Sequence, residues 1–195
     1  MRTLTLLATL AATPAWATCP TGADLATGIT FTSDAGDRDT FTSIGNGVVQ
    51  IDGVATDGFT YRTLLGQGVH VLQLSDTENG QPISDSVVST SYPMAARDLP
   101  IPTAQSRWDV DTIINGYGDI YAEAQSQTWG QPITFRVGDC AFDALPGKIR
   151  YESDGFTVNE EVIYLPELSM SLLISYEDDG APKDTWTYID VEVAR

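Results

Sequence analysis

The sequence predicts an all-β protein built of antiparallel strands. Turn-forming dipeptides ending in glycine recur along the chain, at Asn46-Gly47, Asp52-Gly53, Asp57-Gly58, Asn79-Gly80, Asp154-Gly155 and Asp179-Gly180. Such dipeptides supply the positive φ angles that tight hairpin turns require. Between them lie short runs rich in Val, Ile, Thr, Tyr and Phe, the residues enriched in strands. In one run Leu168, Met170, Leu172 and Ile174 occupy alternate positions, and this period of two indicates a strand with one buried face.

The start of the chain has the composition of a secretory signal peptide. Met1-Arg2-Thr3 is a short positive segment, an apolar run extends from Leu4 to Ala12, and Ala15-Trp16-Ala17 is a small-x-small cleavage site. We expect residues 1–17 to be removed by cleavage between Ala17 and Thr18. The apolar run is far shorter than the roughly 20 residues that span a bilayer, and no later run approaches that length. A periplasmic or secreted protein without a membrane span is therefore predicted.

Two cysteines, Cys19 and Cys140, remain in the mature chain. In an oxidising compartment an even pair indicates a disulfide. A lipid-modified Cys19 is the alternative, but Trp16 and Thr18 fit a lipoprotein signal poorly. A redox-active thiol would usually come with a C-x-x-C motif, which the sequence lacks. We therefore expect a structural Cys19–Cys140 bond.

Residues 18–195 are expected to form a single domain that contains an internal repeat. At an offset of 100 residues, the acidic turn and proline of 78–82 align with those of 178–182, and Val49 and Ile51 align with Ile149 and Tyr151. We predict two similar β-meanders, 28–90 and 132–194, packed as a sandwich or a flattened barrel. Convergence of two similar meanders is the alternative to duplication.

The connector, 91–131, differs in character from the two meanders. Three prolines mark its first part as irregular. Its second part carries apolar residues at intervals of three to five positions, namely Trp108, Ile113, Tyr117, Tyr121 and Ala124. That spacing predicts one short amphipathic helix. Trp108, Tyr117 and Tyr121 are candidates to line a ligand site, or else to close the ends of the core.

Motifs for catalysis are largely missing from the sequence. It has one histidine, His70, and no G-x-S-x-G elbow or glycine-rich phosphate loop. The repeat places His70 opposite Met170 on the inward face, so we expect a half-buried, hydrogen-bonded strand histidine without a catalytic role. The acidic group Asp34, Asp37 and Asp39 departs from EF-hand spacing and is interpreted as a solvated loop. No catalytic, cofactor-binding or metal-ligating residue is assigned, and no cofactor is expected.

Charge and composition restrict the class of function. The chain has 10 Lys and Arg against 27 Asp and Glu, a net charge of −17, so nucleic-acid binding is not expected. A hydrophobic content of 42% is too high for a disordered chain. We expect an exported acidic envelope protein acting as a non-catalytic binding or structural module, with a small apolar ligand or a cationic protein as partner. The alternative is a periplasmic hydrolase that uses Asp and Glu for acid–base chemistry.

The last third of the chain resembles a known group of sequences. The resemblance lies in three segments, Gly138-Asp139-Cys140-Ala141-Phe142, Tyr164-Leu165-Pro166-Glu167-Leu168 and Asp184-Thr185-Trp186-Thr187-Tyr188. Together they are similar to a pattern in uncharacterised exported proteins of alphaproteobacteria. The resemblance implies a Gram-negative periplasmic or secreted setting and brings no activity with it.

Overall fold

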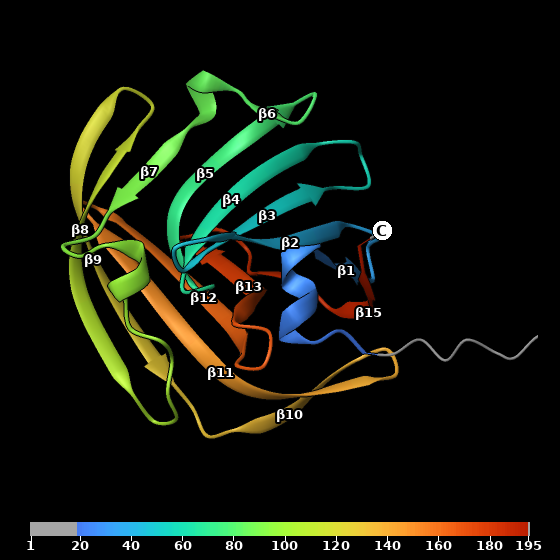
Figure 1. Cartoon of the computed structure of the whole chain (residues 1–195). Coiled ribbons are helices and arrows are strands. Elements are labelled where there is room, and N and C mark those ends of the chain that lie inside the picture. Colours follow the sequence, from blue (N-terminus) through green and yellow to red (C-terminus); the bar gives the residue numbers. More distant parts are fainter. Residues whose placement is uncertain (1–18, 195) are drawn as a thin grey trace, which may run out of the picture.

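The computed structural model describes residues 19–194, and in them nearly all regular structure is antiparallel β (Figure 1). The predicted all-β fold class is therefore confirmed. The expected signal peptide, 1–17, and its cleavage point at Ala17 and Thr18 lie outside the described residues. Within 19–194, no helix is long and apolar enough to cross a membrane.

The strands form one sheet in the order β14-β13-β12-β11-β9-β8-β7-β5-β4-β3-β2-β1-β15. The first half comprises β1 (Ile29–Ser33), β2 (Arg38–Gly45), β3 (Val48–Val54), β4 (Thr60–Gly66), β5 (His70–Glu78), β6 (Gln81–Pro82) and β7 (Val88–Ser91). The second half comprises β8 (Arg107–Gly116), β9 (Asp119–Trp129), β10 (Ile133–Val137), β11 (Cys140–Ser153), β12 (Phe156–Leu165), β13 (Met170–Asp178), β14 (Asp184–Thr185) and β15 (Tyr188–Val193). Off this path, β6 pairs with β5 and β10 pairs with β11.

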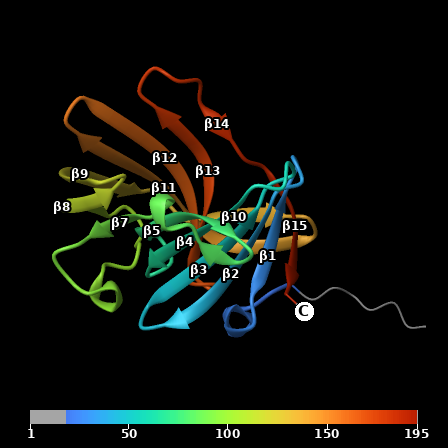
Figure 2. The same ribbon diagram turned by 90° about the horizontal axis from the view of Figure 1, so that it is seen from above.

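The two expected meanders are arms of this single sheet. We call β1–β5 the first arm and β11–β13 the second arm. In Figure 2 the first arm (blue to green) and the second arm (orange to red) lie on different sides, and β7–β9 join them. The two edge strands, β14 and β15, are separated along the chain only by Trp186 and Thr187. The sheet must therefore curl until its edges come near each other.

The core lies between the two arms. Its main cluster joins Phe31 and Phe41 of the first arm to Leu165 and Met170 of the second, and all four side chains are buried. As predicted, Leu168, Met170 and Leu172 share one buried face. Ile174 packs against the cluster but is only partly buried. The curled sheet thus buries one face of each arm and leaves the other face to solvent.

The predicted disulfide is confirmed. The sulfur atoms of Cys19 and Cys140 are bonded at 2.09 Å, with their Cα atoms 5.5 Å apart. Cys140 is the first residue of β11, and Cys19 precedes the 3-10 helix η1 (Gly22–Ala26). The bond therefore fastens the start of the described chain to the second arm.

The prediction of an amphipathic helix in the connector is wrong. The connector carries only the short 3-10 helix η3 (Ala96–Asp98), and a second 3-10 turn, η2 (Ser84–Ser86), precedes it. Trp108 lies in β8, Tyr121 lies in β9, and Tyr117 has a positive φ of 54° in the turn between them. Glycines on both sides of Tyr117 favour this turn over a continuous helix. Burial alternates along β8, where Thr112 and Ile114 are buried.

Most of the predicted glycine turns are present, with one exception. Asn46 and Gly47 both have positive φ angles, as do Asn79 and Gly80. Asp52-Gly53, by contrast, lies inside β3 rather than in a turn. The physical reason is close packing, because a Cβ on Gly53 would collide with the ring of Tyr61. A glycine inside a strand often marks such a close approach.

The predicted duplication stays a prediction. The β4–β5 and β12–β13 hairpins each contain one register shift, between Leu64 and Leu65 and between Glu161 and Val162. The hairpins before them differ in length, because 55–59 connect β3 to β4 whereas only 154–155 connect β11 to β12. The two arms therefore share the order and pairing of their strands, but equivalent strands are not separated by a constant number of residues.

Candidate ligand-binding cleft

A cleft of about 600 Å³ lies between the two arms. Much of its wall is apolar. The first arm contributes Phe41, Ile51 and Leu65, and the second arm contributes Val162 and Leu173. Trp186, in the short link between the two edge strands, lines it as well. The curl of the sheet therefore creates a hollow whose walls come from segments far apart in the sequence.

One carboxyl group on the first arm is held by two tyrosines. Asp39 of β2 accepts hydrogen bonds from the hydroxyl of Tyr61 at 2.5 Å and from that of Tyr188 at 3.3 Å. All three residues line the cleft. Burial raises the pKa of Asp39 above its ordinary value, and the two hydroxyl donors oppose that rise. Gly53 permits this arrangement, since the Tyr61 ring packs over it on the way to Asp39.

A second carboxyl group lies on the opposite wall. Glu160 of β12 lines the cleft, and its Oε2 accepts a hydrogen bond from the hydroxyl of Tyr151 at 2.9 Å. Burial raises the pKa of Glu160 to about 7, and the nearby charge of Glu123 contributes to the rise. The neighbouring Glu161 points to the other face of the strand, where it pairs with Lys148 and Lys183. Adjacent residues on a strand point to opposite faces, and this pair does so.

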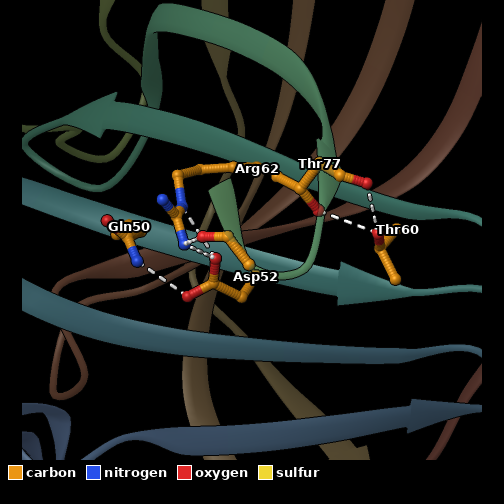
Figure 3. Close-up of polar contacts among 6 residues, drawn as sticks. Gln50, Asp52, Thr60, Arg62 and Thr77 are labelled. Atoms are coloured by element: carbon orange, nitrogen blue, oxygen red, sulfur yellow. Dashed lines mark hydrogen bonds and ion pairs between the residues drawn. The ribbon is translucent and has the colours of Figure 1, made fainter. Parts of the chain in front are cut away.

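Arg62 is the basic residue among those that line the cleft, but its charged group is engaged elsewhere (Figure 3). Its Nε donates a hydrogen bond to Asp52 at 2.8 Å, and its guanidinium also donates to the carbonyl of Gly80 at 3.3 Å. Gln50 donates to the same Asp52 carboxylate at 2.7 Å. Asp52 and Arg62 are register partners on β3 and β4, on the face opposite to Ile51 and Tyr61. The guanidinium is therefore committed to the outer face of the sheet.

His70 is a hydrogen-bonded strand histidine, as predicted, but it is fully buried rather than half-buried. Its side chain is 1% exposed. Nε2 donates a hydrogen bond to the carbonyl of Pro100 at 2.8 Å, and Nδ1 accepts one from the Gln127 amide at 3.0 Å. Burial lowers the pKa of His70 to about 4, so the imidazole is neutral near neutral pH. Both ring nitrogens are therefore hydrogen-bonded within the core.

The structure separates the three predicted lining aromatics. Tyr117 lines the cleft, although it is 80% exposed. Trp108 stacks on Tyr92 and packs edge-on against His70, with ring centroids 6.0 Å and 4.8 Å away. Tyr121 is 45% exposed on β9. Neither Trp108 nor Tyr121 is among the described residues that line this cleft.

Sequence reasoning misses the residues that make the cleft distinctive. Asp39 belongs to the acidic group interpreted as a solvated loop, yet it lies in β2 against two tyrosines. The sequence feature that could have revealed this arrangement is Gly53, since a glycine within a strand indicates the close approach of another group. Glu160 carries no local signal. Within residues 19–194, no group of three or more His, Cys, Asp or Glu is placed to hold a metal ion.

No known protein family, curated protein or solved structure was found to match the chain. The cleft itself is therefore the basis for any functional conclusion.

Proposed function

We propose that this protein is an exported, acidic, non-catalytic binding protein that takes a small, mainly apolar ligand in the cleft between its two arms. The observation that carries the proposal is the cleft of about 600 Å³, walled largely by apolar and aromatic side chains. Ligand sites are typically concave, mainly apolar and about 300 to 1,000 Å³ in volume. Removing apolar ligand surface from water would supply the binding free energy, at roughly 25 cal/mol per Å² before the cost of association.

Export to the periplasm or beyond is supported by two features. The first is the signal-like composition of residues 1–17. The second is the Cys19–Cys140 disulfide, because such bonds persist in oxidising compartments and are rare in the cytosol. A native mass spectrum of the protein isolated from its own cell envelope tests this part of the proposal. We expect a chain that begins at Thr18 and is lighter than the reduced chain by two hydrogens, whereas a lipid increment on Cys19 would contradict it.

Ligand uptake is tested with N-phenyl-1-naphthylamine, a neutral apolar dye whose fluorescence rises on leaving water. We expect the wild-type protein to bind the dye. Leu173→Trp places a larger side chain in the cleft and should weaken binding about tenfold or more. Ile44→Trp is the matched control, because Ile44 is 51% exposed on β2 and does not line the cleft. Absence of dye binding, or equal loss in both variants, would refute the binding site.

Hydrolysis with a carboxylate as general acid or base is the second candidate function. It is favoured by one observation, a cleft-lining glutamate, Glu160, whose pKa is raised to about 7, near the optimum for proton transfer at neutral pH. With Glu160 as the base, activity would fall as pH drops through about 7, and Glu160→Gln would remove that activity. A broad screen of ester and glycoside substrates that gives no turnover would leave the binding function as the proposal.

A further inference from the structure

We propose that the cleft selects organic cations, that is, molecules with an apolar body and one ammonium group seated against the carboxylate of Glu160. This inference rests on the proposed binding function and specifies the class of ligand. Three independent features of the described residues support it. They are the charges that line the cleft, the Glu160 carboxylate oxygen that accepts no hydrogen bond, and the aromatic rings around the hollow.

The charges on the cleft wall are acidic. Asp37, Asp39, Asp76 and Glu160 line the cleft, and the basic lining residue, Arg62, is bound to Asp52 on the outer face. An anionic ligand would therefore enter an apolar hollow without an available counter-charge, which is costly. A cationic ligand would meet carboxyl groups whose charges are otherwise only partly compensated. Charge complementarity thus favours a cation.

Of the two cleft-lining carboxyl groups whose pKa is raised by burial, Asp39 and Glu160, Glu160 is the one with capacity for a further partner. Tyr151 donates to its Oε2, while its Oε1 accepts no hydrogen bond from residues 19–194. Asp39, by contrast, already accepts from Tyr61 and Tyr188. A partly desolvated carboxylate oxygen without a protein partner is stabilised by a cation at hydrogen-bond or contact distance. The ammonium group is therefore assigned to Glu160.

The groups that face Glu160 add no positive charge of their own. Tyr151 of β11 donates to it, and Tyr176 of β13, Glu123 of β9 and Tyr92 lie near enough for their charges to be coupled to it. These neighbours are neutral phenols and one further carboxyl group. A bound ammonium would therefore be the first positive charge in this part of the cleft.

Aromatic rings around the hollow complete the recognition site. They are Phe41, Tyr61, Tyr117, Tyr176, Trp186 and Tyr188, all of which line the cleft. The faces of such rings attract cations, with the greatest effect where water is excluded. A quaternary ammonium cannot donate a hydrogen bond, so cation–π contacts with these rings would supply most of its binding free energy. It also keeps its charge at every pH, which makes it the cleanest probe.

Binding of a cation must be linked to a proton. With a pKa of about 7, Glu160 is about half protonated at neutral pH. The ammonium group binds the carboxylate form, so binding lowers the pKa of Glu160 and releases a fraction of a proton near neutral pH. Affinity for the cation should accordingly rise with pH through about 7. A neutral ligand of the same length should show neither effect.

The experiment compares three probes that share one alkyl chain: decyltrimethylammonium, 1-decanol and decanoate. Each is titrated calorimetrically, below its micelle concentration, in two buffers with different heats of ionisation so that proton release is measured. We expect the cation to bind wild-type protein at least about tenfold more tightly than decanol. Decanoate should bind most weakly.

Two Glu-to-Gln variants, one inside the cleft and one outside it, separate the cleft from the acidic surface. Glu160→Gln should lose the preference for the cation and the proton release while keeping decanol affinity, which also reports that the cleft is intact. Glu78→Gln removes an exposed carboxylate at the end of β5 and should behave as wild type. Cation preference and proton release that persist in Glu160→Gln would overturn the inference.

The remaining outcomes distinguish this inference from the proposed function. Equal wild-type affinity for the cation and for decanol would overturn the ligand class and leave the apolar binding site standing. Absence of binding for all three probes, together with absence of dye binding, would overturn both.

Discussion

Buried titratable side chains in this protein are held by neutral partners rather than by opposite charges. His70 is bonded to an amide and a carbonyl, and Asp39 to two phenols. Because burial disfavours the charged form, the pKa of His70 falls while the pKa values of Asp39 and Glu160 rise. The histidine and the two carboxyl groups therefore make stability depend on pH in opposite directions.

At His70 the folded protein binds protons less readily than the unfolded chain. Its pKa is about 4 in the folded state against 6.5 for a solvated histidine, so its contribution to stability is complete above pH 6.5 and lost as pH falls towards 4. We expect that loss to reach about 3 kcal/mol. The measurement is urea unfolding of wild type and His70→Gln from about pH 7 to about pH 4. The variant removes this titration and leaves the carboxyl groups in place.

The quantity to compare is the difference in unfolding free energy between the two proteins. The unfolding free energy of wild type minus that of His70→Gln should fall steadily as pH falls, whatever its value at neutral pH. A difference that is constant across the whole range would show that His70 can be protonated in the folded protein without penalty.

At the scale of elements, the turn between β4 and β5 binds the start of β13 across the molecule. The carbonyl of Gly68, between β4 and β5, accepts hydrogen bonds from the backbone N–H and the hydroxyl of Ser171, each at 2.8 Å. Gly68 has a φ of +70°, and a Cβ there would lie 2.1 Å from the carbonyl oxygen of Ser169. The contact between the first and second arms therefore requires glycine for space as well as for conformation.

Alanine substitutions at two glycines separate these requirements. Gly80 has a φ of +73° with nothing within 4 Å of the added Cβ, so Gly80→Ala should cost about 1 to 2 kcal/mol from conformation alone. Gly68→Ala adds a backbone collision and should cost about 3 kcal/mol or more. Urea unfolding of both variants provides the comparison. Equal costs would mean that the β4–β5 turn moves away from β13 without a further loss of stability.

Local patterns predict the strands and most turns, because period-two burial and glycine φ angles are properties of neighbouring residues. They fail in the connector, where apolar residues three to five positions apart also suit a hairpin with a central turn at Tyr117. They fail at Asp52-Gly53 because a glycine that creates space has the same sequence signature as one that makes a turn. The pairing of Cys19 with Cys140 is predictable because only two cysteines exist.

At the scale of the whole molecule, the cleft is not predictable from the sequence. It exists because curvature of a continuous sheet brings Asp39 of β2 and Glu160 of β12 into one hollow. Curvature is the sum of small twists at every strand pair, and no local motif records it. Of the three aromatic residues predicted to line a ligand site, only Tyr117 does so in this cleft, because the other two were placed by a helical spacing that the chain does not adopt.

The disulfide is a second property of the whole molecule, because it joins residues separated by 121 positions. Closing so long a loop in the unfolded chain should stabilise the protein by about 4 to 5 kcal/mol. We expect the double variant Cys19→Ser/Cys140→Ser to lose that amount in urea unfolding without reducing agent. Reduction of the wild-type protein should give a similar loss. A loss below about 1 kcal/mol would show that strain or residual structure cancels the entropic effect.

The pairing of β1 with β15 has a consequence for how the protein forms. Ile29 lies opposite Val193, so one of the first strands to be synthesised must wait for one of the last before its outer side is covered. A nascent chain therefore carries an unpaired strand edge throughout its passage from the ribosome, and such an edge readily joins other chains. Residues 29–33 are therefore the segment whose edge stays open for association until β15 has been made.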